Sequence, residues 1–379
     1  MQEMINKNGN GVWSIVAVMG MLVGSMVCGV GQFNAQACTS AIISGKLTRN
    51  GRPILWKHRD SGCEDNKVER ISATDSTFSY VALLNATDSL CAEAWCGLNE
   101  KGFAIMNTAS YNLKNDTVTK VDCEGLLMSE ALGRCVSVDD FEALLKSHAK
   151  PLGVEANFGV IDALGGGAYF EVGNSQYTRF DVPEDSGWLV RTNYSYTGRK
   201  DEGYGYIREQ NAKDLLAPHI KSRDIEPATF TEELSRTYYH SLLGRDYTQS
   251  GETWLVDQDF IPRRTSCASC VIEGVNEAKD ARRCTMWVEL GLPQCAEVRA
   301  VWCAEDGVPT DVRGTLPNGH STLCDEAIAR KREVFPISRG SGKSYLRFDL
   351  LYNAQGTGYA QTTHQKNVEY YKKMRRVRK

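Results

Sequence analysis

The segment Ala35-Gln36-Ala37-Cys38 constrains this chain most, because it decides where the folded protein begins. It follows an apolar run over residues 12–30. A polar start, an apolar stretch and a small-x-small triplet are typical of a secretory signal that is cut after its last alanine. We therefore predict a signal peptide over residues 1–37 and export of the mature chain to the periplasm or the medium. The apolar run is also long enough to span a membrane, so an uncleaved anchor is one alternative. Lipidation of the cysteine is another.

Cleavage at this point would make Cys38 the first residue, with a thiol and a free α-amino group on the same residue. The pKa of an α-amino group lies near ~7.7–8.0 and that of a free thiol near ~8.5. The amine can therefore take the thiol proton at neutral pH, directly or through a water molecule. This arrangement combines a nucleophile and its base in one residue, in a compact form of the activated nucleophile. Lipidation of Cys38 would abolish both functions.

The composition of the 379 residues is that of an ordinary globular protein, with 42% hydrophobic and 24% charged side chains. A formal net charge of -3 argues against a nucleic-acid partner. The one run of like charge is the C-terminal segment 372–379, which we expect to be a solvated basic tail. Contact of this tail with a membrane surface or another anionic partner is the alternative. We expect no stable membrane insertion after cleavage, and the sequence leaves the oligomeric state open, a homo-oligomer included.

The 13 cysteines permit disulfides in an exported protein, but their pairing cannot be deduced from the sequence. Cys267 and Cys270 have the spacing of a redox pair, yet they lie in an apolar run that predicts a buried strand. No second pair of this spacing and no histidine pair at ligand spacing accompany them. We therefore expect no zinc or other metal site and no cofactor.

Apolar runs separated by turn signals predict a chain of strands with helices in its middle and near its end. We expect strands at residues 41–43, 53–56, 78–84, 95–107 (with a turn at 99–102), 157–162, 168–172, 187–193, 254–256, 266–272, 285–288 and 298–302, and helices at 121–135, 137–145, 204–216, 231–243 and 326–334. Runs of strands, then helices, then strands favour a single α+β domain over residues 38–379, built as a layered sandwich.

Asn50-Gly51 is a strong hairpin signal, because both residues tolerate positive φ. A hairpin folded symmetrically about this pair would place residues near 59–63 opposite residues 38–41. The segment Lys57-His58-Arg59-Asp60 would then lie beside Cys38, where a carboxylate favours an ammonium and a cation favours a thiolate. A surface salt bridge at a strand end is the alternative interpretation.

Three segments, in this order, resemble the N-terminal-nucleophile (Ntn) hydrolases of the choloylglycine hydrolase and penicillin acyltransferase group. They are Cys38-Thr39-Ser40 with Asp60 downstream, Gly97-Leu-Asn-Glu-Lys-Gly-Phe-Ala-Ile-Met-Asn107, and Arg191-Thr192-Asn193. Within that group the chain is most similar to the carcinine hydrolase/isopenicillin-N acyltransferase-like branch of linear amide C–N hydrolases. The resemblance covers most of residues 38–310 and implies a four-layer αββα sandwich.

The resemblance also implies a role for each matching position. Cys38 would be the nucleophile, its α-amine the base, and Asp60 the carboxylate that holds the amine. Asn107 and Asn193 would lie at the oxyanion site, although asparagines at strand ends are ordinary turn residues in most proteins.

Two basic positions do not match the family pattern uniquely. Arg264 would be the arginine near the thiolate, although Arg263 fits the pattern equally. Bile-salt hydrolases carry an arginine three residues before the aspartate, where this chain has Lys57. This departure weakens a bile-salt assignment and leaves the nucleophile assignment intact.

The sequence thus predicts an exported amidohydrolase that cleaves a small-molecule linear amide through a thioester on its first cysteine. Arg59, Trp56 and Tyr194 are expected to contact the substrate, the two aromatic residues as part of an apolar acyl pocket. A position in the protein core is the alternative for these aromatics. A secreted dipeptidase or an acyltransferase of the same superfamily, and a lipid-anchored binding protein without activity, are the alternative functions.

Overall fold

The computed structural model describes residues 38–377, so the predicted signal peptide over residues 1–37 lies outside the described residues. The strands and helices follow one another as β1 (Thr39–Ile43), β2 (Ile54–Asp60), β3 (Asn66–Ile71), β4 (Tyr80–Asn85), β5 (Cys96–Asn99), β6 (Ala104–Ala109), α1 (Glu124–Arg134), α2 (Val138–Ser147), β7 (Ala156–Ile161), β8 (Gly167–Val172), β9 (Tyr177–Asp181), β10 (Trp188–Arg191), α3 (Tyr206–Ser222), β11 (Tyr239–His240), β12 (Arg245–Asp246), β13 (Trp254–Val256), β14 (Ser266–Glu273), β15 (Thr285–Leu290), β16 (Arg299–Val301), α4 (Thr322–Val334), β17 (Tyr345–Arg347) and α5 (Tyr359–Val377).

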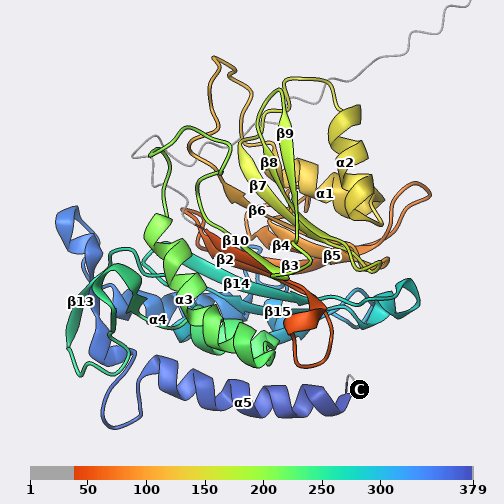
Figure 1. Ribbon diagram of the computed structural model, residues 1–379. Coiled ribbons are helices and arrows are strands. Elements are labelled where there is room, and N and C mark those ends of the chain that lie inside the picture. The colour runs from red at the N-terminus through yellow and green to blue at the C-terminus, as the bar shows by residue number, and fades with distance from the viewer. Residues whose placement is uncertain (1–37, 378–379) are drawn as a thin grey trace, which may run out of the picture. The chain divides into compact units, whose positions relative to one another are not determined.

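Two large sheets lie face to face, and helices cover both outer faces (Figure 1). Six strands form one sheet in the order β10-β1-β2-β14-β15-β16, and seven form the other in sequence order from β3 to β9. An apolar cluster that includes Leu55, Met106 and Cys270 fills the space between them. A second cluster joins α1 and α2 to the seven-stranded sheet, and a third joins α3 and α5 to the six-stranded sheet. The predicted α+β fold with four αββα layers is therefore confirmed.

Strand β2 carries charged side chains into both layers around it. All seven of its residues are buried, although four of them are Lys57, His58, Arg59 and Asp60. Successive side chains of a strand point to opposite faces. Leu55 packs between the sheets and Trp56 packs under the helices, so the lysine and arginine face the other sheet, whereas the histidine and aspartate face the helix side. Buried charges are costly unless they find partners, so this strand indicates a functional site.

Most predicted elements are confirmed, and one of them shows why local signals work. The helix predicted to begin after Ser137 starts there as α2, and Ser137 and Asp140 form a reciprocal capping box. The glycine triplet 165–167 joins β7 to β8, as expected for a hairpin. Cys267 and Cys270 lie in the fully buried strand β14, as the apolar run predicts.

The helix predicted over residues 231–243 is wrong. A short π-type turn, η2 (Thr229–Leu234), is followed by the two-residue strand β11. The cause is Arg236, whose buried guanidinium Nε donates to the carbonyl of Thr231 at 2.9 Å and pairs with Glu289 at 2.7 Å. The side chain takes a carbonyl that a continuing helix would have used, which a local helix pattern does not reveal.

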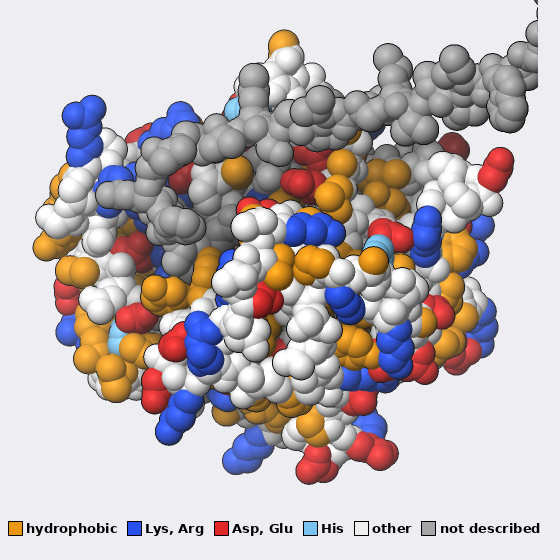
Figure 2. Space-filling model, turned by 90° about the horizontal axis from the view of Figure 1, so that it is seen from above, with side chains coloured by type: hydrophobic (Ala, Val, Ile, Leu, Met, Phe, Trp, Pro, Cys, Tyr) orange, Lys and Arg blue, Asp and Glu red, His pale blue; other side chains and the backbone are white. Residues whose placement is uncertain are grey.

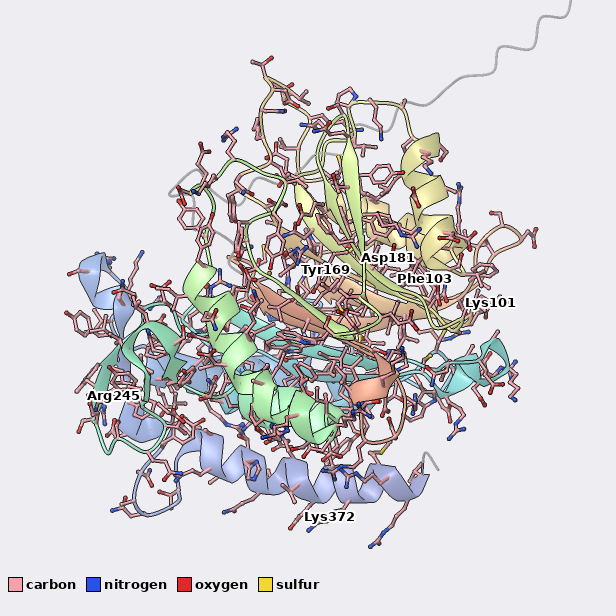
Figure 3. The ribbon with its side chains drawn as sticks, viewed as in Figure 1. Lys101, Phe103, Tyr169, Asp181, Arg245 and Lys372 are labelled. Carbon is pink, nitrogen blue, oxygen red and sulfur yellow. The ribbon has the colours of Figure 1, made fainter. Side chains whose placement is uncertain are left out.

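The basic side chains of the predicted solvated tail are exposed where the structure describes them, but the segment that carries them is helical. Residues 372–377 continue helix α5, which packs on the six-stranded sheet. Tyr371 and Met374 are buried, because they lie one turn apart on the same helix face. Lys372 points away from the sheet (Figure 3). The charges therefore occupy the outer face of a docked helix.

The described surface carries mixed charge. Basic and acidic side chains are interspersed on the face shown in Figure 2, in keeping with the small net charge of the chain. Within residues 38–377, no helix combines the length and the apolarity that a membrane crossing requires.

Candidate active site

Cys38 lies directly before β1 and is only 5% exposed. Its thiol approaches the backbone carbonyl of Asp60, with 3.8 Å between sulfur and oxygen. The pairing of the two strands differs from the expected symmetric hairpin, because Thr39 lies opposite His58 and Ser40 opposite Lys57. A one-turn 3-10 helix over 45–47 lengthens the connection and shifts the register. The segment 57–60 still reaches the nucleophile, but residues 59–63 do not lie opposite 38–41.

Asp60, whose backbone carbonyl contacts this thiol, also has a buried carboxylate. Its Oδ1 accepts a hydrogen bond from the Ser266 hydroxyl at 2.6 Å. Its Oδ2 forms an ion pair with Nε of Arg263 at 3.3 Å but accepts no hydrogen bond from residues 38–377. Burial raises the pKa of Asp60 to about 6, although the nearby Arg263 and Arg208 oppose the shift. The site therefore holds a buried acceptor that still lacks a donor.

His58 is neutral in this surrounding. Burial, and then the charges of Arg263 and Arg208, lower the pKa of His58 to about 3. Because Ser266 donates its hydroxyl proton to Asp60, His58 Nε2 must carry a proton and donate it to Ser266 Oγ at 2.7 Å. The 3.6 Å contact between His58 and Asp60 is therefore not an ion pair. This chain of hydrogen bonds orients Asp60.

The structure places Arg263, and not Arg264, at the site. Arg263 contacts Asp60, and its NH2 group donates to the carbonyl of Phe260 at 2.7 Å. Arg264 instead donates from its guanidinium to the carbonyl of Ile337 at 3.2 Å in an exposed position. The two residues are neighbours at the start of β14, where a bulge shifts the pairing with β2. Sequence spacing could not tell which of them turns inward.

Asn193 and Asn107 approach the same region from different elements. Asn193 follows β10, is fully buried, and donates from Nδ2 to the carbonyl of Ala109 at 2.9 Å. Asn107 lies in β6 of the other sheet and accepts a hydrogen bond from Lys57 Nζ at 2.7 Å. The amide of Asn193 has a second hydrogen on Nδ2 that can serve an oxyanion.

Lys57 is a buried cation on the inner side of β2. Its Nζ donates to Asn107 and to the carbonyl of Trp95, both of them neutral groups. Burial lowers the pKa of Lys57, and the Cys38 sulfur is the foremost group that opposes this shift.

Sequence reasoning missed Arg208, which ties the site together. This residue of α3 is 1% exposed. Its NH1 group donates to the carbonyl of Cys38 at 2.6 Å and to the Thr39 hydroxyl at 2.9 Å, and NH2 donates to Asn193 Oδ1 at 2.9 Å. An arginine in a helix is usually a surface residue, so its position gave no signal. The one local hint is Gly205, whose φ of 97° starts the helix and where a side chain would collide with the guanidinium.

The predicted substrate contacts have different positions. Arg59 is buried between the sheets, where it bonds Asn66 and Asn85 and covers the ring of Trp95 at 5.1 Å. Trp56 is fully buried on the opposite face, where its indole donates to Ser269. Both side chains are buried in the core, which for Trp56 is the alternative given in the sequence analysis.

Tyr194 is half-buried next to Asn193. It stacks on Tyr206 with 4.0 Å between ring centroids and bonds Glu209. Of the three predicted substrate contacts, it is the one that is not fully buried.

A single group of side chains in the described part of the chain has the geometry of a metal site, and it lies elsewhere. His320 Nδ1 lies 2.9 Å from Asp325 and 3.5 Å from Asp65. All three side chains are partly exposed, and a hydrogen bond between His320 and Asp325 accounts for their arrangement. The candidate active site itself is built from a thiol, a lysine, two arginines, a carboxylate and amides.

A pH-dependent gain in stability is expected for Asp60→Asn while Ala37 is still attached. The folded chain keeps the Asp60 proton up to about pH 6, whereas an unfolded aspartate releases it near ~3.9. Folding therefore loses stability as pH rises between these values, and the cost persists above pH 6. Asparagine carries no charge, so the free energy of unfolding of the variant should be about 2–3 kcal/mol higher than that of the unmodified protein at pH 7.5. At pH 4 the two free energies should be equal.

Urea unfolding at both pH values tests this on protein made without export. Asp139→Asn, at an exposed carboxylate paired with Arg179, is the control and should change little. An equal gain at pH 4 and pH 7.5 would contradict the raised pKa of the buried Asp60 carboxyl.

Comparisons with known proteins concern the architecture. No protein-family model matches the chain, and no curated protein matches it in sequence. Among solved structures, a Caenorhabditis elegans N-acylethanolamine-hydrolyzing acid amidase ortholog has a TM-score of 0.43 at 13% identity, covering 64% of this chain and 96% of that chain. A mutant of the conjugated bile acid hydrolase from Clostridium perfringens has a TM-score of 0.44 at 12% identity, and the match covers 70% of this chain and 92% of that chain. Penicillin V acylase from Agrobacterium tumefaciens has a TM-score of 0.43 at 12% identity, and the match covers 71% of this chain and 87% of that chain. The roles of individual residues rest on the site geometry and not on these similarities.

Proposed function

We propose that the protein is an exported cysteine amidohydrolase of the Ntn type, whose mature chain begins at Cys38 and cleaves a linear amide. One observation carries the proposal. The backbone carbonyl of Asp60 contacts the Cys38 thiol, and the buried carboxylate of the same residue has one oxygen, Oδ2, that lies 3.3 Å from Nε of Arg263 but accepts no hydrogen bond from residues 38–377. Signal cleavage would create an ammonium group on Cys38, and such a donor would satisfy that oxygen and neutralise the charge.

The reaction divides into two steps. The Cys38 thiolate attacks the amide carbonyl carbon, the C–N bond breaks, and the leaving amine takes a proton from the α-ammonium. The free α-amine then takes a proton from water, whose oxygen displaces the sulfur and releases the carboxylic acid. If a second amine takes the place of water, the product is a new amide and the enzyme acts as an acyltransferase.

The surrounding residues stabilise charge during both steps. Lys57, held by Asn107 and the carbonyl of Trp95, would stabilise negative charge that develops at the site. Asn193 and a backbone N–H would donate to the oxyanion, and one such donor is typically worth ~3 kcal/mol. Arg208 holds the carbonyl of Cys38 and the amide of Asn193 at once, so it sets the distance between nucleophile and oxyanion site. Arg263 and the Ser266–His58 pair orient Asp60.

Lys57 also bears on which branch of the linear amide hydrolases we propose for this chain. The carcinine hydrolase/isopenicillin-N acyltransferase-like branch remains our assignment, because a lysine replaces the arginine of bile-salt hydrolases here. The substrate would be a small linear amide. The alternative of a lipid-anchored binding protein requires a lipidated Cys38. It predicts that this residue has neither a free thiol nor a free amine.

The test is mass spectrometry of the protein exported from a native-like host, after brief treatment with iodoacetamide. The chain is expected to begin at Cys38, with a free amine and with the alkyl group on that thiol ahead of the other cysteines. Cys295, which is buried and whose pKa burial raises to about 12, is the internal comparison. A chain that begins elsewhere, or a lipid on Cys38, would refute the proposed mechanism.

A further inference from the structure

A cavity of about 530 Å³ lies on the helix side of the six-stranded sheet, and it shares no residue with the candidate active site. It is bounded by the connection between β1 and β2, by residues 226–228, by the ends of β14 and β15, and by the last turns of α5, which runs along this side of the molecule (Figure 1). Its size is that of sites for small organic ligands.

The floor of this cavity is apolar. Trp287, Tyr371 and Met374 line it, each only 6% exposed, and the tryptophan and tyrosine rings lie 4.6 Å apart. The indole N–H of Trp287 is buried and has no hydrogen-bond partner within residues 38–377. The cavity floor is therefore an apolar surface built from two aromatic rings and a thioether.

The rim of the cavity is positively charged. Four arginines and two glutamates line it: Arg49, Arg52, Arg283, Arg375, Glu226 and Glu273. Arg52 is already satisfied by Glu273 and by three backbone carbonyls. Arg49 and Arg375 share the single carboxylate of Glu226, at 3.7 and 2.6 Å. Both are more than half exposed, so a further anion can approach them from solvent.

We propose that this cavity binds an amphipathic carboxylate, with its apolar chain on the Trp287–Met374 floor and its carboxylate between Arg49 and Arg375. The excess of cations on the rim selects an anion, because guanidinium groups form paired hydrogen bonds with carboxylates. The apolar floor selects a ligand with a hydrocarbon part. The site is independent of the proposed amide hydrolysis, since no residue of the candidate active site takes part.

Calorimetric titration of the exported protein with decanoate, below its micelle concentration, tests the proposal. Saturable binding of one decanoate per chain is expected, and decan-1-ol should bind about tenfold more weakly because it lacks the charge. The double variant Arg49→Gln with Arg375→Gln should weaken decanoate binding about tenfold. Arg134→Gln is the matched control: it changes an equally exposed arginine paired with Glu130, on α1 of the other sheet, and should leave binding unchanged.

Three results would overturn the proposal. They are no saturable binding of decanoate, equal binding of decanoate and decan-1-ol to the unmodified protein, and undiminished binding in the double variant. The comparison of the two ligands needs no mutation, so it holds even if the double variant does not fold. Co-sedimentation with phosphatidylglycerol vesicles, without binding of free decanoate, would show that the arginines serve a membrane surface instead. Alkylation of Cys38 should leave decanoate binding intact, which separates this site from the active site.

Discussion

Replacing Cys38 by alanine is expected to abolish amide hydrolysis, with a loss in kcat on the order of 10⁶-fold, as for removal of other covalent nucleophiles. The thiol is the group proposed to form the acyl intermediate, whereas Asp60 is bonded to Ser266 and Lys57 to two oxygen acceptors. The measurement is release of amine from a panel of fluorogenic acyl amides, with the N-terminus of each variant verified by mass.

Two further variants make this result interpretable. Cys38→Ser keeps the α-amine and a weaker nucleophile, so we expect a small residual rate. Cys295→Ala removes a buried thiol away from the site and should keep full activity. Activity of Cys38→Ala equal to that of the unmodified protein would rule out the thioester and with it the proposed function.

Replacing Arg208 by methionine is expected to lower kcat/KM about 10²–10³-fold, the size of effect seen when an oxyanion donor is lost. Methionine fills much of the space but leaves the Cys38 carbonyl, the Thr39 hydroxyl and Asn193 Oδ1 without their common donor. The free energy of unfolding should fall by roughly 3 kcal/mol for the same reason.

A positioning role makes a sharper prediction than a structural one. Arg208→Lys restores the charge but reaches fewer of the three acceptors, so it should recover stability more than kcat. The control Lys221→Met, at an exposed position of the same helix, should change neither quantity. If Arg208→Met lost stability but kept kcat after stabilisation by lower temperature, Arg208 would hold the fold and not the reaction geometry.

Much of the fold could be predicted from local signals. The β7–β8 hairpin follows from its glycines, and α2 follows from Ser137 and Asp140, because turns and caps depend on residues close in sequence. The helix prediction for residues 231–243 failed because the structure there depends on contacts between residues far apart in the sequence. Arg236 draws its partners from η2, β15 and α5, and no local pattern encodes such contacts.

The residues of the candidate site also fall into those that local sequence indicates and those that only the tertiary structure places. The sequence alone determined which residue could be an activated nucleophile, because the chemistry of an N-terminal cysteine needs only a cleavage signal and the residue after it. It also indicated Asp60 and Asn193 through the resemblance. The tertiary structure decided that Arg263 turns inward and Arg264 outward, that Trp56 and Arg59 are core residues, and that Arg208 reaches Cys38 from a helix 170 positions later. The physical reason is that strand alternation and one bulge decide which way each side chain points, and that long-range hydrogen bonds form only once the layers have packed.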